Sequence, residues 1–577
     1  MEKSVRGRQW NFRCDDDTKI EALIATGHSQ TVARLLAGRG ISPDAADTFL
    51  TPSLRTQMPD PSTLKDMDKA AVCILNAVQK RENIYIFADY DVDGGTSAAQ
   101  LIRWGRAMGV DFGLYVPDRV KEGYGPSIDA FKSLKKRDAE LVITVDCGAA
   151  ATEALIVAKD IDLPIIVIDH HLMEGAMPPC EALVNPNRAD DSSGLGHLAA
   201  AGVTFLLLAA LNREARRRVL EVPDLLSFLD LTALGTICDV VPLIGLNRAY
   251  VAQGLKVLFA KPNPGLAALA RVAGTSGPYT TYHGGFILGP RINAGGRIGQ
   301  ADMGAKLLSS DNEELIEKYA HELDVINTQR KELQDRILIE SLELAQNLPD
   351  DHQVIIVSMT GWHAGIIGIV AGRLKDRFGK PAIVIGIDDE GLGKGSGRSI
   401  AGVNLGAAIY KAKQEGFLIA GGGHEMAAGL TIDSSKIEEF REFIETVMSE
   451  EIREARKSSG MKIDALLSAS AANSELIAQI NKCAPYGTKN PEPVFAFPDM
   501  RVTFAKRLNG GHVRCGFEDN SGGRINGIVF RAEESRLADV LLMPNPPRVH
   551  IAGRLKENTW QGRTKIDLTV TDIAIAD

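Results

Sequence analysis

The stretch that most limits the folds open to this 577-residue chain is the apolar run Ile84–Ala88, together with the polar residues that follow it. The run is rich in β-forming residues, and it leads into three carboxylates at alternate positions, Asp89, Asp91 and Asp93. Two glycines and two hydroxyl residues then lead into a helix-like segment at 98–108. In open α/β sheets, ligands bind just beyond the carboxyl ends of the strands. The stretch therefore predicts a buried strand that delivers carboxylates to the ligand-binding edge of a sheet.

The three carboxylates need an explanation, because crowded negative charges are costly unless a cation neutralises them. Oxygen ligands of this kind are the ones that hard divalent cations prefer. The alternative is an Asx-turn followed by a helix N-cap, which would account for one or two of the aspartates. The rest of the chain favours a metal site.

The neighbouring segments alternate between helix and strand. We expect strands at 84–88, 112–116, 141–145 and 164–168, with helices at 64–80, 96–108, 127–136 and 150–159. This order is typical of a parallel, doubly wound α/β sheet. The strands of such a sheet are buried on both faces and are continuous apolar runs, as Leu-Val-Ile-Thr-Val and Ile-Ile-Val-Ile are here.

Two later strands of this sheet also end in polar side chains. The residues that follow them are Asp146, Asp169, His170 and His171. Asp239 adds a further carboxylate, after an apolar helix and before a turn at Pro242. A single aspartate after a strand is usually a helix cap, but four such groups at one edge are hard to explain as independent caps. Mixed carboxylate and imidazole ligands suit Mn²⁺ or Mg²⁺, and bridging carboxylates suit two ions about 3.5–4 Å apart.

Composition narrows the class of protein. With 45% hydrophobic and 24% charged residues, the chain is long enough for several hydrophobic cores. No apolar run reaches the roughly 18–20 residues of a membrane span, and no apolar segment follows the charged start as in a secretory signal. The seven cysteines contain no Cys-x-x-Cys pair, which fits a reducing cytoplasm and disfavours a zinc knuckle. Because the net charge is −9, nucleic-acid contacts must come from local basic patches.

We divide the chain into five parts on these patterns. Residues 1–61 form a mostly helical extension with several prolines in its second half, which we interpret as a lid packed on the next domain. The other four parts are the α/β domain at 62–310, one long linking helix at 311–347, a second α/β domain at 348–458 and a small β-barrel at 459–577. The helix is predicted by its apolar stripe among charges, and the barrel by short strands separated by Gly- and Pro-rich turns.

The second α/β domain contains three Gly-rich stretches, at 361–374, 394–399 and 421–429. Backbone amides of Gly-rich turns at helix N-termini bind phosphate, so we expect an anion site here. Arg398 can grip two phosphate oxygens, and His363 or His424 can donate one more hydrogen bond. Each stretch taken alone is more often a tight turn.

The last region has basic residues near aromatic ones. We expect strands at 501–508, 512–518, 524–531, 548–556 and 565–573. The basic residues are Lys506, Arg507, Arg514, Arg524 and Arg554, and the aromatic residues are Phe504, Phe517 and Trp560. This pattern fits an OB-fold that grips single strands by charge and stacking, and the alternative is a solvated barrel face without a ligand.

Four motifs together make the chain recognisable. They are Asp89-Tyr-Asp-Val-Asp-Gly, Val145-Asp-Cys-Gly, Asp169-His-His and Gly235-Thr-Ile-Cys-Asp-Val-Val-Pro-Leu243. In this order they resemble the motifs of the DHH phosphoesterase superfamily, and most closely those of its RecJ exonucleases. The resemblance implies a DHH domain, a DHH-associated domain that holds the substrate, and a C-terminal OB-fold. It also implies a two-metal, 5′→3′ exonuclease that is specific for single-stranded DNA, releases mononucleotides and acts in DNA repair and recombination.

The resemblance assigns roles to individual residues. The implied metal ligands are Asp89, Asp91, Asp93, Asp146, His170 and Asp239, with His171 as a further catalytic residue on the phosphate or behind the ligands. The implied substrate-binding residues are Arg119, Tyr124, Arg291, Asn293, Arg297, His363, Ser396, Arg398 and His424. A plain surface loop remains the alternative for Arg119 and Tyr124. The family more often has alanine at Gly295 and cysteine at Gly397, and neither difference removes an arginine.

Three other functions compete with this one. DHH enzymes that act on small nucleotides are shorter and lack the C-terminal barrel. DHH pyrophosphatases have a histidine four residues before the first paired aspartate, where this chain has Phe87. Catalytically dead scaffolds of the superfamily lose ligands, and every ligand position is intact here. We therefore expect a cytoplasmic, monomeric nuclease with Mn²⁺ or Mg²⁺ as cofactor, single-stranded DNA as substrate, and a helicase and a single-strand-binding protein as partners.

Overall fold

The computed structural model describes residues 4–118, 122–173, 175–349, 351–458, 460–532, 536–560 and 563–576. The chain forms two compact units. One unit, called here the acidic unit, consists of 43–328 and 483–492. The other, called the barrel unit, consists of the described residues before 43, of 329–482 and after 492. Within the described residues, no helix is both long enough and apolar enough to cross a membrane.

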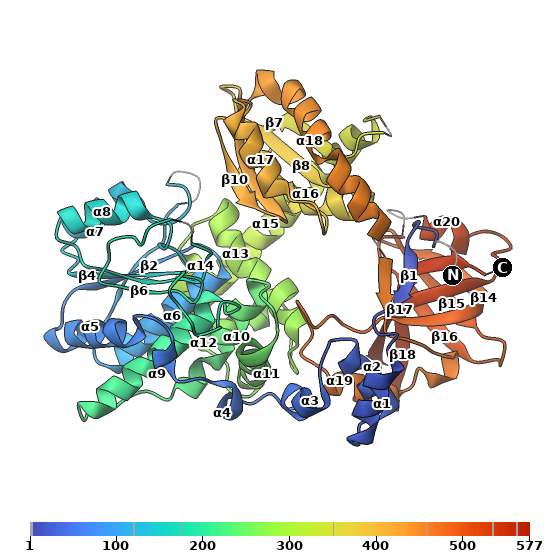
Figure 1. Ribbon diagram of the computed structural model, residues 1–577, viewed down its shortest axis with the longest axis horizontal. Helices are drawn as coiled ribbons and strands as arrows, with labels where there is room; N and C mark the ends of the chain where they lie inside the picture. Colours follow the sequence, from blue (N-terminus) through green and yellow to red (C-terminus); the bar gives the residue numbers. More distant parts are fainter. Residues whose placement is uncertain are drawn as a thin grey trace. The chain divides into compact units, whose positions relative to one another are not determined.

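The acidic unit is built on a five-stranded parallel sheet. Its strands lie in the order β3 (Gly113–Tyr115), β2 (Ile84–Ala88), β4 (Leu141–Val145), β5 (Ile165–Ile168) and β6 (Ala182–Val184). Helices α5 (Met67–Lys80), α6 (Val92–Ala107) and α9 (Ala200–Arg217) cover one face, and α7 (Ile128–Lys136) and α8 (Thr152–Asp160) cover the other (Figure 1). Alternate residues of β2 belong to the two cores: Ile86 packs with the first set of helices and Phe87 with the second. The predicted doubly wound sheet is confirmed.

Helices make up the rest of the acidic unit. They are α3 (Pro43–Leu50), α4 (Leu54–Gln57), η1 (Pro61–Thr63), η2 (Leu225–Phe228), α10 (Leu229–Cys238), α11 (Gly245–Ala260), α12 (Pro264–Val272), the π-helix η3 (His283–Leu288), α13 (Gly289–Ile298) and α14 (Met303–Ser309). A separate apolar core joins α6 to this group, with Val92 and Ala99 against Leu234 of α10 and Ile292 of α13. This core holds α10 and α13 beside the start of α6.

The predicted long helix is also observed. Helix α15 spans Glu313–Gln346, and the boundary between the two units falls within it, at 328/329. Its apolar residues Ile316, Ala320 and Leu323 pack into the helical core of the acidic unit.

The barrel unit contains a second α/β sheet. Its strands lie in the order β10 (Ala420–His424), β11 (Ala427–Asp433), β9 (Leu392–Arg398), β8 (Ala382–Ile387) and β7 (Ile355–Thr360), and only β7 and β8 are parallel. The associated helices are α16 (Ala364–Phe378), α17 (Leu405–Gln414), η4 (Ser434–Lys436) and α18 (Ile437–Ser458). The predicted second α/β domain is therefore present.

Two of its Gly-rich stretches are strands and not turns, so our prediction of their conformation was wrong. Residues 394–398 lie in β9, and 421–424 lie in β10. The glycines of β9 leave room for neighbouring apolar side chains: a Cβ at Gly395 would lie 2.6 Å from Leu430, and one at Gly397 would lie 2.6 Å from Leu405. Close packing, and not a phosphate-binding turn, accounts for these glycines.

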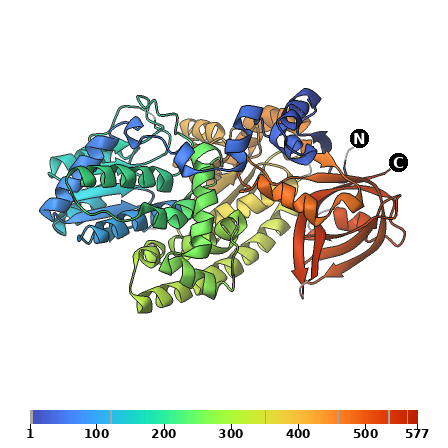
Figure 2. The same cartoon turned by 90° about the horizontal axis from the view of Figure 1, so that it is seen from below.

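The C-terminal region forms the predicted β-barrel. Its sheet has the order β13 (Ala465–Leu466), β14 (Phe495–Leu508), β15 (His512–Glu518), β16 (Arg524–Val529), β18 (Arg563–Ile575) and β17 (Val549–Trp560). Strands β14 and β17 also pair, which closes β14 to β18 into a barrel (Figure 2). Helices η5 (Ala469–Ala471), α19 (Ser474–Lys482) and α20 (Leu537–Leu541) complete the region. The predicted strands are all observed, although β14 begins earlier than the expected residue 501.

The N-terminal segment differs in part from our interpretation. Strand β1 (Gln9–Phe12) pairs in parallel with β12 (Gly460–Ile463), and the Trp10 indole donates a hydrogen bond to Asp572 at 3.1 Å. Helices α1 (Asp17–Ala25) and α2 (Gln30–Ala37) follow in the same unit. The described residues before 43 therefore belong to the barrel unit, whereas 43–61 belong to the acidic unit, where Leu54 and Met58 pack against its core as the interpretation expects (Figure 1).

Candidate metal centre

Parallel register brings the polar strand ends together at one edge of the sheet. Ala88 lies beside Val145, and Val145 lies beside Ile168, so β2, β4 and β5 end level with one another. The next residue in each strand is an aspartate: Asp89, Asp146 and Asp169. Continuous apolar runs place the strands, and strand pairing then fixes where the acids meet. The sequence predicted this convergence.

The carboxylates of Asp91 and Asp93 each cap the start of a helix. Asp91 is the N-cap of α6, and its carboxylate accepts hydrogen bonds from the amides of Asp93 at 2.8 Å and Gly94 at 3.1 Å. Asp93 lies in the first turn, 1% exposed, and caps α9 by accepting from the amides of Ala200 at 2.6 Å and Ala201 at 2.9 Å. The alternative of an Asx-turn followed by a helix N-cap therefore applies to Asp91. Because Asp91 is the N-cap, α6 starts at Val92, earlier than the predicted residue 96.

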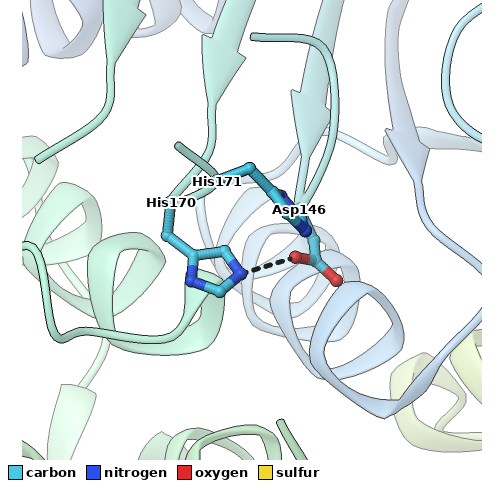
Figure 3. Close-up of side chains that lie close together, drawn as sticks. All are labelled: Asp146, His170 and His171. Atoms are coloured by element: carbon cyan, nitrogen blue, oxygen red, sulfur yellow. Dashed lines mark ion pairs between the residues drawn. The ribbon is translucent and has the colours of Figure 1, made fainter. Parts of the chain in front are cut away.

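His170 faces the carboxylates through a single ring nitrogen. Its Nε2 lies 3.2 Å from Asp146 Oδ1, 3.6 Å from Asp239 Oδ2 and 3.9 Å from Asp93 Oδ2. Its Nδ1 lies 3.0 Å from the carbonyl oxygen of Leu198, to which it donates as the neutral ring. The Nε2 lone pair then points at the carboxylates (Figure 3). Among the described residues this buried nitrogen has no hydrogen-bond partner, as expected of a metal ligand.

Among the described residues the potential ligands form three overlapping groups of three. One group is Asp89, Asp91 and Asp146, and another is Asp93, His170 and Asp239, which directly follows the last residue of α10. The third group, Asp146, His170 and His171, takes one member from each of the other two (Figure 3). In each group one donor atom per residue lies within 4.8 Å of the others. The short distance from His170 to Asp146 joins the first two groups. Two groups of oxygen and imidazole donors that meet at one carboxylate suit two divalent cations.

Burial and mutual repulsion disfavour ionisation of the cluster without a cation. Burial and the charge of Asp91 raise the pKa of Asp93 to about 7. Burial and the charges of Asp93 and Asp91 raise the pKa of Asp239 to about 9. The same causes raise the pKa of Asp146 well above its ordinary value, and burial lowers the pKa of His170 to about 4. A bound cation would reverse these effects, because it favours the charged carboxylates and the neutral imidazole.

Asp169 organises the site without facing the cluster. Its carboxylate accepts from the amide of Ala149 at 2.9 Å and from the amide of His170 at 2.7 Å, and it lies 2.7 Å from Nδ1 of His171. Burial opposes the charge of each partner, but the hydrogen bond between them prevails. It lowers the pKa of Asp169 to about 2 and raises that of His171 to about 9. The His171 ring is therefore a cation held in a fixed orientation.

Tyr124 continues this chain of hydrogen bonds. Its hydroxyl lies 3.2 Å from Nε2 of His171 and donates to the carbonyl oxygen of Asp146 at 3.3 Å. The two rings meet edge to face, and Tyr124 remains 58% exposed. An exposed aromatic ring anchored beside the carboxylates can stack on a planar group.

Family models match three parts of the chain. They describe the DHH family, N-terminal domain, over residues 83–236; the DHHA1 domain over 351–450; and the RecJ OB domain over 463–572. The single-stranded-DNA-specific exonuclease RecJ of Bacillus subtilis is 33% identical to the chain over 574 residues, covering 99% of the chain and 71% of that protein. The protein of the same name from Salmonella typhimurium is 33% identical over 557 residues, covering 94% and 95%.

The chain belongs to the RecJ family. A crystal structure of RecJ in complex with Mn²⁺ from Thermus thermophilus matches it with a TM-score of 0.81 at 27% identity, over 99% of this chain and 80% of that one. The resemblance inferred from the four motifs is confirmed.

Helix α13, which carries the predicted RecJ-like residues Arg291, Asn293 and Arg297, lies against the metal centre. A Cβ at Gly289 would collide with Sγ of Cys238, and one at Gly296 would lie 2.7 Å from the Tyr90 ring. The first of these contacts is next to Asp239 and the second is next to Asp89 and Asp91. The Arg291 guanidinium donates to Asp324 at 2.8 Å and to the carbonyl oxygen of Ile287 at 2.7 Å, so here it stabilises the helix.

Among the predicted substrate-binding residues of the barrel unit, Ser396 and Arg398 lie in contact with one another. Arg398 donates to Ser396 Oγ at 3.2 Å, and both side chains lie close to Gly368 of α16, where a Cβ would be 2.8 Å from Ser396 Oγ and 3.1 Å from Arg398. His363 is the N-cap of the same helix and accepts from the amide of Gly365 at 3.0 Å. His424 lies beside Ala427, which lies beside Arg398. Arg119 lies outside the described residues.

One of the aromatic residues predicted to stack on single strands in the barrel is wrongly assigned. Phe517 is 1% exposed and belongs to the core, so it cannot stack on a base. Phe504, at 45% exposed, remains available on the next strand. Arg524 forms an ion pair with Glu518 at 2.7 Å, which partly neutralises it. The side chain of Trp560 is not described.

Sequence reasoning missed the segment His197–Ala201. Its backbone positions two of the predicted ligands, through the carbonyl oxygen of Leu198 and the amides of Ala200 and Ala201. Backbone groups, which every residue possesses, carry this function, so the residue types gave no signal.

Proposed function

We propose that this chain is a metal-dependent exonuclease that removes mononucleotides from the 5′ end of single-stranded DNA, in repair and recombination. The observation that carries the proposal is the meeting of the two ligand groups at Asp146 and His170. The names of the RecJ relatives support the substrate, and the Mn²⁺ complex of the Thermus thermophilus protein supports the cofactor.

In this proposal each ligand group holds one Mn²⁺ or Mg²⁺ ion. The residues are Asp89, Asp91 and Asp146 for one ion, and Asp93, His170 and Asp239 for the other. When bound, the two ions would activate a water molecule for attack on the phosphodiester and stabilise the negative charge that develops there. The backbone amides that cap Asp93 and the carbonyl that orients His170 keep these donors in place before the substrate arrives.

The chain's other residues bind and orient the DNA. The protonated His171, fixed by Asp169, presents positive charge toward a phosphate, and Tyr124 offers a face to the terminal base. Ser396 and Arg398, with His363 and His424, are proposed to anchor phosphates, as are Arg119, Asn293 and Arg297. We propose the domains as 62–310 for catalysis, 348–458 for substrate binding and 459–577 for the single-strand grip, with 1–61 and 311–347 as extension and linking helix.

The seven cysteines are free, which fits the reducing cytoplasm. We also propose that the protein is a monomer and that a helicase and a single-strand-binding protein are its partners.

The direct test is degradation of 5′-labelled and 3′-labelled single-stranded DNA with Mn²⁺, Mg²⁺ or EDTA, with duplex DNA and RNA as controls. We expect metal-dependent release of mononucleotides from the 5′ label first, and none in EDTA. A duplex without single-stranded ends should be cut much more slowly. Tight DNA binding without cleavage in any metal would refute the proposal and favour a DNA-binding scaffold.

Stability should depend on pH in a direction that metal reverses. The folded-state pKa values of Asp239 and His171 are raised to about 9, so between pH 7 and 9 the folded protein holds protons that the unfolded chain does not. The free energy of unfolding of the metal-free protein should therefore fall as pH rises through this window. Saturating Mn²⁺ should raise the unfolding midpoint more at pH 9 than at pH 7, because the ligands bind metal when deprotonated. Thermal melts in EDTA and in Mn²⁺ at both pH values measure this, and an EDTA midpoint that rises with pH would contradict it.

A further inference from the structure

Asn247, near the start of α11, lies at a buried junction between two segments of the acidic unit. Its side chain is 0% exposed. The carboxamide nitrogen donates to the carbonyl oxygen of His197 at 2.6 Å and to that of Pro242 at 3.0 Å. The carboxamide oxygen has no hydrogen-bond partner among the described residues. Leaving a buried acceptor unpaired costs free energy. The two donated hydrogen bonds therefore account for a polar side chain at this buried position.

The first of these segments, His197–Ala201, positions two ligands of the same group. The residue after His197 is Leu198, whose carbonyl oxygen accepts from His170 Nδ1 at 3.0 Å. Ala200 and Ala201 donate their amides to the two carboxylate oxygens of Asp93. A shift of this segment would move His170 and Asp93 together.

The second segment carries the third ligand of that group. Asp239 caps α10, and the turn that follows runs through Val240, at φ 60°, to Pro242. The amide of Leu243 then donates to the carbonyl oxygen of Thr488 at 2.9 Å, which anchors the far end of the turn. Asn247 thus links the Asp239 turn to the segment that holds His170 and Asp93.

We propose that Asn247 is a positioning residue that sets the spacing of the group Asp93, His170 and Asp239, and thereby the affinity of one of the two metal sites. The inference rests on the proposed function, in which that group holds a divalent ion. The other group, Asp89, Asp91 and Asp146, lies at the ends of β2 and β4 and is positioned by sheet pairing. Asn247 makes none of its described hydrogen bonds to the segments that carry that group.

The chemistry of the junction accounts for asparagine at this position. Both neighbours are carbonyl oxygens, so the residue must donate twice from one point while remaining neutral in a buried place. Leucine has a similar volume but no donor, and serine has one donor. The carboxylate of an aspartate would place acceptor oxygens against the two carbonyl oxygens, which can only accept. The loss of affinity should therefore increase from serine to leucine.

The test is isothermal titration of the full chain with Mn²⁺ in the absence of DNA, for Asn247→Ser, Asn247→Leu and the unsubstituted protein. Tyr250→Phe is the matched control: it removes a buried hydrogen bond of 3.4 Å from the same helix to the carbonyl oxygen of Gly202 in α9. Among the hydrogen bonds of the described residues, none joins that oxygen to a potential metal ligand. We expect two equivalents of Mn²⁺ in the unsubstituted protein and the control. In Asn247→Leu one equivalent should keep its affinity and the other should weaken about 10- to 100-fold, the range typical of residues that orient metal ligands.

A second readout separates positioning from a general loss of structure. The cleavage rate of Asn247→Leu should recover when Mn²⁺ is raised by the factor lost in affinity, and its melting curve in EDTA should remain cooperative. If the leucine variant does not fold, Asn247→Ser can be measured in the same way, and we expect a smaller loss of Mn²⁺ affinity for it. Unchanged binding of both equivalents, or equal weakening of both, would overturn the inference while leaving the nuclease proposal intact. Failure of the unsubstituted protein to bind Mn²⁺ would overturn both.

Discussion

Replacing Asp146 by asparagine should abolish cleavage of single-stranded DNA while making the metal-free protein more stable at alkaline pH. Asp146 is the carboxylate at which the two ligand groups meet, 3.2 Å from His170 and in one group with Asp89 and Asp91. Its loss should weaken both metal sites, and we expect the rate to fall by at least about 10²- to 10³-fold, as when a preorganised electrostatic group is removed.

The gain in stability follows from the same location. Burial and four neighbouring carboxylates raise the pKa of Asp146 well above its ordinary value, so ionising it in the folded protein costs free energy. Asparagine removes that cost and keeps the shape of the protonated acid. The gain should be absent below about pH 4, where the unfolded chain also keeps the acid protonated, and should increase as the pH rises toward the raised folded-state pKa of Asp146. Each ~1 kcal/mol should raise the melting temperature by about 2–4 °C.

Backbone strain should not obscure the result, because asparagine tolerates the left-handed conformation that Asp146 adopts at φ 60°. Asp162→Asn is the matched control, since Asp162 is an exposed aspartate at φ 51° outside the cluster. Melting in EDTA at pH 6 and 9, with cleavage assays in Mn²⁺, measures both effects. An active Asp146→Asn protein would refute the assignment of Asp146 as the shared ligand.

The parts of this centre that the sequence predicted are those carried by side chains. Asp89, Asp146 and His170 each follow a continuous apolar strand, and parallel pairing leaves them only one edge on which to meet. Leu198 contributes only a carbonyl oxygen, which every residue possesses, so its contribution to the centre had no sequence signal.

Two errors in the fold have similarly local causes. The strand 392–398 was mistaken for a turn because glycines at alternate positions resemble a loop, whereas here they make room for Leu405 and Leu430. Strand β1 was missed because four residues carry little periodicity and its partner, β12, lies at 460–463. Pairing at that separation is decided by the tertiary structure and not by local preference.

Replacing Arg248 by methionine should strongly destabilise the acidic unit. Arg248 is 2% exposed, and its guanidinium donates to the carbonyl oxygens of Phe49 at 2.8 Å, Cys483 at 2.9 Å, Ala484 at 2.7 Å and Pro485 at 3.0 Å. The guanidinium carbon also lies 3.8 Å from the centre of the Phe49 ring. One side chain therefore anchors the segment 483–492, which returns to this unit from a distant part of the sequence.

Methionine fills a similar volume but cannot donate, so the carbonyl groups of Phe49 and Ala484 would lose this donor, whereas those of Cys483 and Pro485 would keep their hydrogen bonds from Asn490. Hydrogen bonds from charged groups contribute about 1.5–3 kcal/mol each, so the loss of the two bonds that Asn490 does not replace should cost about 3–6 kcal/mol in all. We expect a loss of that size in urea unfolding of the metal-free protein. Amide hydrogen exchange at 483–490 should also be faster in the variant under native conditions.

The control for charge alone is Arg217→Met, which removes an exposed arginine whose ion pair with Glu214 spans 3.5 Å. Such surface pairs contribute about 0–1 kcal/mol, so this variant should unfold like the unsubstituted protein. If Arg248→Met also lost less than about 1 kcal/mol, the segment 483–492 would have to be held by its other contacts, such as Leu243 to Thr488 and Thr281 to Tyr486. A large loss would instead assign this anchoring to a single arginine, which directly follows Asn247 in α11.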